Sequence, residues 1–174
     1  PKAKKFNASK IFTNHFKEEE KIILEKEKEK EKILKETSKR HEKLKNKAEE
    51  TESGLKYHVT KSGNGIKVDE NKVILTHYAV YFEDGRLLDT SVLEIAEKFN
   101  MVNIQRKNAN GYTPIEAKVG PKDMMISGFK EGLKLLNIGD KAILYIPYYL
   151  AYGEMENRGT VSYTHLRAHE TLPY

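Results

Sequence analysis

The sequence predicts an α+β protein in which a long charged helix precedes a compact domain. Three observations indicate this class. A run of alternating Lys and Glu near the start has no Gly or Pro, which is typical of a helix. Short β-branched and aromatic runs follow, separated by turn residues, and one amphipathic helical segment lies among them. At 174 residues the chain has room for one domain and an appendage.

Composition divides the chain near residue 52. Residues 1–52 carry 16 Lys/Arg and 12 Asp/Glu, and so most of the formal net charge of +5, whereas the rest is close to neutral and holds most of the Gly, Pro and Tyr. We therefore expect a charged helical arm over 1–52 and a domain from residue 53. The chain has no Cys, which excludes disulfides, thiolate metal sites and a cysteine nucleophile. It also lacks an apolar run of about 18 residues, so we expect no membrane span.

The arm is predicted to be helical over residues 17–50. Its apolar residues Ile23, Leu34 and Leu44 are too sparse for a coiled-coil seam. The pattern favours a solvated, semi-rigid helix between two bodies, with a dimerising helix as the alternative. Binding to nucleic acid is disfavoured, because the Lys residues alternate with Glu and no aromatic residues lie among them for base stacking.

The domain begins with strand signals. The Asp84-Gly85 pair inside "KVILTHYAVYFEDGRLLD" predicts a hairpin. In the last predicted strand, Ala142, Leu144 and Ile146 alternate toward the interior against outward partners. The segments predicted as strands or hairpin are 55–65, 72–89, 113–120 and 141–149.

The segment "DMMISGFKEGLKLLNIGD" is predicted to form the helix of the domain. Its apolar residues form one stripe along such a helix, and Gly139 lies just beyond its end. The members of the stripe are Ile126, Phe129, Leu133 and Leu136. One helix laid across an antiparallel sheet accounts for the α+β class.

Two stretches, "HYAVYFEDGRLLDTS" and "GFKEGLKLLNIGDKAILYIPYYLAYGE", resemble the FKBP-type peptidyl-prolyl isomerases over roughly residues 54–160. This resemblance implies a five-stranded antiparallel half-barrel wrapped on the short helix, with a proline pocket between helix and sheet. It also implies proline-containing polypeptides as substrates, FK506-like macrolides as further ligands, and no cofactor.

The resemblance assigns the site residue by residue. Phe129 would form the floor of the pocket, where many relatives have Trp, and Tyr78 and Asp89 would form a polar wall. The hydroxyl of Tyr152 and the backbone N–H of Ile126 would hold substrate carbonyls. The expected catalytic residues are Tyr78, Asp89, Phe129 and Tyr152, and the expected substrate-binding residues are Leu88, Ile115, Met125 and Ile126.

Two departures from the family pattern in the pocket wall leave an alternative function open. Leu88 and Ile115 stand where the family usually has Phe, so the pocket wall is less aromatic. A non-catalytic peptide-binding module on the same fold is therefore the alternative function. Residues 92–112 form an insertion beside the pocket rim, which either shapes substrate or partner choice or is a surface excursion.

The end of the sequence departs most. From Ser162 the family pattern of the last strand stops, and "SYTHLRAHETLPY" resembles translated adapter read-through. We therefore expect the last strand to be missing and residues 162–174 to be a non-native tail. His165 and His169 have the spacing of a helical metal pair, but no third ligand lies in a recognisable place, so we expect no metal site.

The arm and its preceding residues resemble linkers of bacterial two-isomerase proteins. This suggests a second, cyclophilin-type isomerase domain upstream. The sequence does not distinguish the bacterial cytoplasm from the periplasm.

Overall fold

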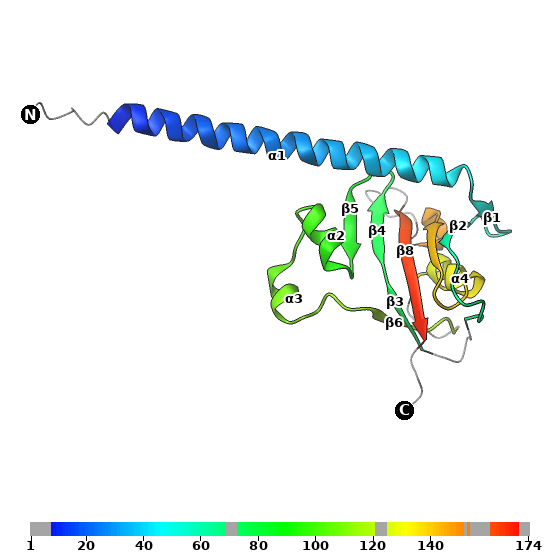
Figure 1. Cartoon of the computed structure of the whole chain (residues 1–174). Helices are drawn as coiled ribbons and strands as arrows, with labels where there is room; N and C mark the ends of the chain where they lie inside the picture. Colours follow the sequence, from blue (N-terminus) through cyan, green and yellow to red (C-terminus); the bar gives the residue numbers. More distant parts are fainter. Residues whose placement is uncertain (1–7, 69–72, 121–124, 152, 154–160, 171–174) are drawn as a thin grey trace, which may run out of the picture.

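The computed structural model describes residues 8–68, 73–120, 125–151, 153 and 161–170, and it confirms the α+β class (Figure 1). The helices are α1 (Ala8–Lys45), α2 (Leu93–Lys98), α3 (Ile104–Asn108), α4 (Ser127–Leu135) and the 3-10 turn η1 (Tyr148–Leu150). The strands are β1 (Glu49–Glu50), β2 (Lys56–Lys61), β3 (Ile74–His77), β4 (Ala79–Phe82), β5 (Leu87–Thr90), β6 (Ile115–Ala117), β7 (Lys141–Tyr145) and β8 (Val161–Glu170). No helix in these ranges is long and apolar enough to cross a membrane.

The described strands form one antiparallel sheet in the order β1-β2-β7-β8-β3-β6, with β4 paired to both β5 and β8. It has eight segments instead of the five expected, in part because the arm contributes β1 and Tyr78 separates β3 from β4. The segments predicted as strands and the Asp84-Gly85 hairpin are confirmed.

The prediction that the last strand is missing is wrong. β8 runs between β7 on one side and β3 and β4 on the other, with Ile143 opposite His165 and Leu75 opposite His169. The backbone N–H and C=O groups of a central strand pair whatever the side chains are, so a weak apolar alternation does not prevent pairing. The non-native origin of residues 162–174 remains a prediction.

Helix α4 packs on the inner face of the sheet and forms the main core. The predicted stripe is confirmed, since Phe129, Leu133 and Leu136 are buried together with the inward residues of β7. Gly132 brings the helix close to β7, because an ideal Cβ at this position would lie 2.2 Å from Leu144 Cδ1.

The outer face of the sheet is also buried, which the alternating pattern of β7 did not predict. Ile143 and Tyr145, expected to face outward, have exposed fractions of 0% and 3%. They belong to a second core cluster with Tyr81, against which Leu44 of the arm and Ile95 and Phe99 of the insertion pack. The arm and the insertion therefore act as a cover for this face.

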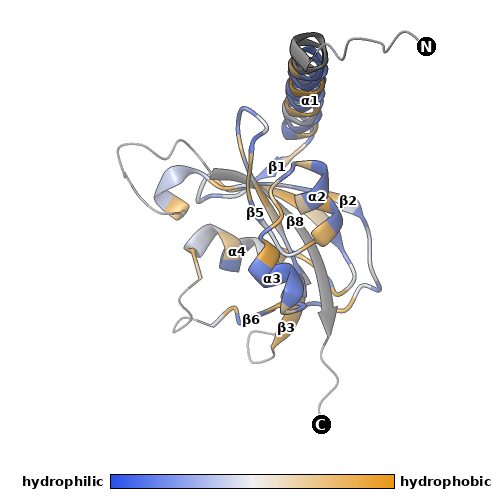
Figure 2. Cartoon of the chain, turned by 90° about the vertical axis from the view of Figure 1, so that its left-hand side faces the viewer, coloured by the Kyte–Doolittle hydropathy of each residue, from blue (hydrophilic) through white to orange (hydrophobic). Residues whose placement is uncertain are grey.

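The expectation that the arm is solvated is correct for residues 15–32, which are all exposed, and Figure 2 shows α1 as largely hydrophilic. It is wrong for the C-terminal turns of the arm. There, His41 is buried, and its ring lies edge-on to Tyr81 with 5.0 Å between centroids. The Tyr145 hydroxyl donates to the His41 carbonyl oxygen at 2.8 Å. The Ser38 hydroxyl donates to the Glu83 carbonyl oxygen at 3.1 Å, so α1 lies directly on the β4–β5 hairpin.

Gly85 in this hairpin gives a test of the docked arm. Its φ is +87°, and an ideal Cβ would lie 2.5 Å from the Leu34 carbonyl oxygen of α1. Gly65 has a similar φ of +78° but nothing within 4 Å, so it is a matched control. We expect Gly65→Ala to lower the free energy of unfolding by about 1 kcal/mol through backbone strain alone. Gly85→Ala should cost about 1–3 kcal/mol more, because α1 must shift.

Chemical denaturation of both variants beside the parent protein measures the difference. Equal losses at the two glycines would contradict the packing of α1 on the hairpin.

Candidate functional site

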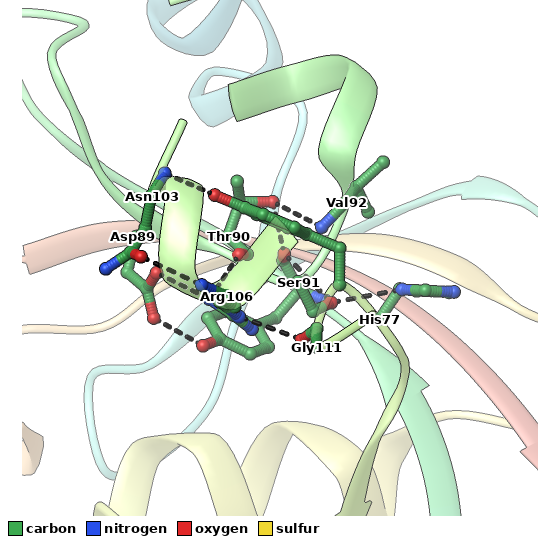
Figure 3. A network of polar contacts seen from close by, with 10 residues as sticks. His77, Asp89, Thr90, Ser91, Val92, Asn103, Arg106 and Gly111 are labelled. Atoms are coloured by element: carbon green, nitrogen blue, oxygen red, sulfur yellow. Dashed lines mark hydrogen bonds and ion pairs between the residues drawn. The ribbon is translucent and has the colours of Figure 1, made fainter. Parts of the chain in front are cut away.

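Tyr78 lies between β3 and β4, and the end of β5 fixes its backbone. The Thr90 hydroxyl and the Ser91 N–H donate to the Tyr78 carbonyl oxygen at 2.8 and 2.9 Å, and the Tyr78 N–H donates to Ser91 Oγ at 2.9 Å. The Tyr78 hydroxyl donates to the carboxylate of Asp89, which lies on β5 (Figure 3). The structure thus brings together the two residues predicted for the polar wall.

Arg106 completes this polar group, and sequence reasoning missed it. Its Nη1 donates to Asp89 Oδ1 at 3.2 Å and to the Thr90 carbonyl oxygen at 2.9 Å. Its Nε donates to the Gly111 carbonyl oxygen at 2.8 Å, and the guanidinium lies 4.7 Å from the Tyr112 ring centroid. The insertion is therefore more than a surface excursion, because it delivers a cation to the predicted wall.

The local sequence explains how Arg106 is held. The Asn103 side chain caps α3 by accepting from the Arg106 N–H at 2.9 Å, which starts the helix just before the arginine. Two features of the sequence point toward Arg106: Asn103 is a helix-capping residue three positions before it, and the wall carboxylate Asp89 favours a cationic partner. Neither feature shows that Arg106 and Asp89 are close in space.

Burial sets the protonation of the tyrosine. Loss of solvent raises the pKa of Tyr78 to about 12, and the hydrogen bond to Asp89 acts in the same direction while Arg106 opposes it. The phenol therefore stays protonated at neutral pH and remains a donor. Nearby Arg106 balances the charge of the carboxylate that receives this hydrogen bond.

This pKa predicts how alkali affects the protein. A phenol that titrates near 10 when unfolded and about 12 when folded stabilises the fold below pH 10 and loses that contribution as the pH rises toward 12. Absorbance titration should show late-ionising tyrosines that include Tyr78 and the buried Tyr81, whose pKa is also raised to about 12. Tyr78→Phe should remove one of them and leave Tyr81. An unchanged late phase in that variant would contradict the assignment.

The apolar residues predicted for the pocket lie around the α4 core. Phe129 is buried in it, and Ile115, Met125 and Ile126 are partly buried against it. Leu88 is 37% exposed beside Asp89 on β5. Tyr152 lies outside the described residues, so its predicted role stays untested.

Strand β3 connects the polar wall with the apolar cluster around Phe129. Its Thr76 pairs with Ile115 on β6, and Tyr78 follows at its end. The polar wall and the apolar cluster are thus on neighbouring strands, whereas no described contact joins Leu88 to Phe129. The predicted backbone donor role of Ile126 also remains a prediction.

No group of three or more metal-ligating side chains occurs among the described residues. The spacing of His165 and His169 would place them on one face of a helix, but both lie in β8. Four residues of strand span about 13 Å along the chain, so the helical spacing does not apply.

A twisted antiparallel sheet packed on one short helix, with a polar group at the β3–β4 junction, defines a half-barrel domain. The sequence matches FKBP-type peptidyl-prolyl cis-trans isomerase over residues 64–174, more than half of the chain. The chain belongs to this family.

Solved structures share the fold. FkpA from Escherichia coli has a TM-score of 0.51 and 21% identity, covering 97% of this chain and 75% of FkpA. AtFKBP13 has a TM-score of 0.52 and 20% identity, covering 73% of this chain and 98% of AtFKBP13. The structure of the three FKBP domains of wheat FKBP73 has a TM-score of 0.52 and 16% identity, covering 70% of this chain and 47% of the wheat chain. A search of curated proteins finds no match.

Proposed function

We propose that this protein is a peptidyl-prolyl cis-trans isomerase that acts on Xaa-Pro bonds in folding polypeptides without a covalent intermediate. The observation that carries the proposal is the group formed by Tyr78, Asp89 and Arg106, at the end of a strand whose neighbour contributes Ile115 to the Phe129 cluster. Family membership supports the same activity.

The chemistry needs no nucleophile. The Xaa-Pro amide resists rotation with a barrier of about 18–20 kcal/mol because of its resonance. Rotation localises the nitrogen lone pair and lowers the polarity of the carbonyl, so an apolar surface favours the twisted form over the planar one. Phe129 would supply the apolar surface under the proline ring, with Ile115, Met125 and Ile126 around it.

The polar group would orient the substrate. The Asp89 carboxylate, held by the Tyr78 hydroxyl and by Arg106, is a fixed dipole that needs no rearrangement when the carbonyl turns. Leu88 would contact the residue beside the proline, and Tyr152 would hold a substrate carbonyl. Proline-containing polypeptides are thus the proposed substrates, and FK506-like macrolides are proposed competitors for the same surface.

The alternative is a module that binds prolyl peptides without turning them over. The exposure of Leu88 favours it, because an aliphatic side chain 37% open to solvent gives a thinner wall than an aromatic one. A protease-coupled assay on an Xaa-Pro peptide, with peptide binding measured in parallel, distinguishes the two. Catalysed exchange supports the isomerase. Binding without acceleration supports the module, and absence of both contradicts the proposal.

A further inference from the structure

A hollow of about 720 Å³ lies beside the insertion, and it is lined by none of the predicted prolyl-site residues that the structure describes. Its floor contains His77 of β3 and Lys141 of β7. One wall is the segment 92–95 at the start of α2, and the rim includes Lys107 and Tyr112. The insertion therefore builds a second concavity on the domain.

The floor belongs to the outer face of the sheet. Thr76 and Ala142, the chain neighbours of His77 and Lys141, are both fully buried, and Ala142 is in the α4 core. Because side chains alternate along a strand, His77 and Lys141 face away from that core. The hollow and the α4 core thus lie on opposite faces of one sheet.

Consecutive residues connect the hollow to the polar group. Tyr78 donates to Asp89, whereas His77 lines the hollow and contacts Ser91 Oγ through Nδ1 at 3.1 Å. In the same way Arg106 binds Asp89 and the next residue, Lys107, lines the hollow. Figure 3 shows His77 and Asp89 on opposite sides of Arg106. The hollow and the polar group of the predicted prolyl site are therefore separated by the thickness of a single backbone segment.

The charges of the hollow favour an anion on the floor side. The Lys107 ammonium is paired with Glu97 at 2.8 Å. For Lys141, no ion pair with a carboxylate occurs within the described ranges. Lys61, which is exposed, lies opposite Lys141 in the ladder and adds a second cation at this edge.

The opposite wall is mostly apolar. Val92, Leu93 and Ile95 line it, and Glu94 between them is the one carboxylate among the described lining residues. A ligand that matches both sides carries an apolar side chain for the wall and a carboxylate for Lys141. A free small anion would leave the apolar wall uncovered.

We propose that this hollow binds an acidic segment of the same polypeptide whose Xaa-Pro bond occupies the predicted prolyl site. The proposal rests on the proposed function, because it assigns a second contact to that substrate. The Asp/Glu residues of the segment approach Lys141 and its apolar residues contact the 92–95 wall. Since only one layer of chain separates the sites, a tethered second contact raises the local concentration of the prolyl bond.

Two peptide comparisons test the proposal. A proline-free peptide of alternating Glu and Leu should bind about tenfold more tightly than the same peptide with Gln for Glu. Lys141→Glu should remove this preference, and Lys141→Gln should reduce it. Lys98→Glu is the matched control, because Lys98 lies on α2, is exposed and does not line the hollow.

The link to the prolyl site needs a second readout. A prolyl reporter peptide extended by the Glu-Leu segment should have a lower KM than the Gln-Leu version, and Lys141→Glu should abolish the difference without changing turnover of an unextended peptide. Equal binding of the Glu and Gln peptides, or equal effects of Lys141→Glu and Lys98→Glu, would overturn the proposal. If no reporter is isomerised while binding still depends on Lys141, the proposed function fails and the acidic-segment site stands.

Discussion

Replacing Asp89 with alanine should lower the catalysed rate of Xaa-Pro exchange by about tenfold to a hundredfold. The variant removes the carboxylate that receives the Tyr78 hydroxyl and leaves the Arg106 guanidinium without its ion-pair partner. The Tyr78 hydroxyl then loses its acceptor at the wall of the proposed prolyl site, and Arg106, still held by the carbonyl oxygens of Thr90 and Gly111, has no carboxylate to orient. A protease-coupled assay with the unextended reporter measures the loss in kcat/KM.

Asp84→Ala provides the matched control. Asp84 also accepts hydrogen bonds from an arginine, with 2.6 Å to Arg86 Nε, and its side chain is as exposed as that of Asp89, but it lies in the β4–β5 turn, outside the proposed prolyl site. It should leave the rate unchanged within about twofold. Equal losses in the two variants, or full activity of Asp89→Ala in a folded protein, would remove Asp89 from the mechanism.

Leu133→Ala should lower the free energy of unfolding by about 2–5 kcal/mol. Leu133 is fully buried in the α4 core. Because the backbone at Gly132 already contacts Leu144, α4 and β7 cannot move closer to fill the cavity that the alanine would leave. Leu24→Ala is the same chemical change at a position 50% exposed on α1, and it should cost no more than about 0.5 kcal/mol. Urea denaturation of both variants measures the two values, and similar losses would contradict the central role of α4.

The sequence allowed the strands, the hairpin turn and α4 to be predicted, because each depends on local pattern. The Asp84-Gly85 pair fixes a turn, and the stripe from Ile126 to Leu136 fixes which side of α4 is buried. The docking of α1 was not predictable in the same way. The half-buried or buried face of its C-terminal half includes Ile33, Leu34 and Leu44. The polar Thr37, Ser38 and His41 lie between them on the same face, so the hydrophobic pattern is too weak to indicate a buried side.

The sequence also predicted only the part of the site that depends on local pattern. Tyr78 and Asp89 lie within one family motif and are in contact. Arg106 is 17 positions beyond Asp89, inside an insertion, and only the three-dimensional path of α3 brings it back. The β8 prediction was wrong because a central strand pairs through its backbone N–H and C=O groups, which the side-chain pattern does not report.

The position of β8 has a consequence for how the protein acquires its native state. In the described sheet, the ladder of β1, β2 and β7 and the ladder of β3 and β6 meet only through β8, which also connects the β4–β5 hairpin. β8 is the last of these strands to be synthesised. Until residues 161–170 emerge from the ribosome, no strand is present that can hydrogen-bond the two ladders to each other. Pairings this distant in sequence, such as β3 with β8, are slow to form, so we expect the closure of this sheet to be a slow step in the folding of the protein.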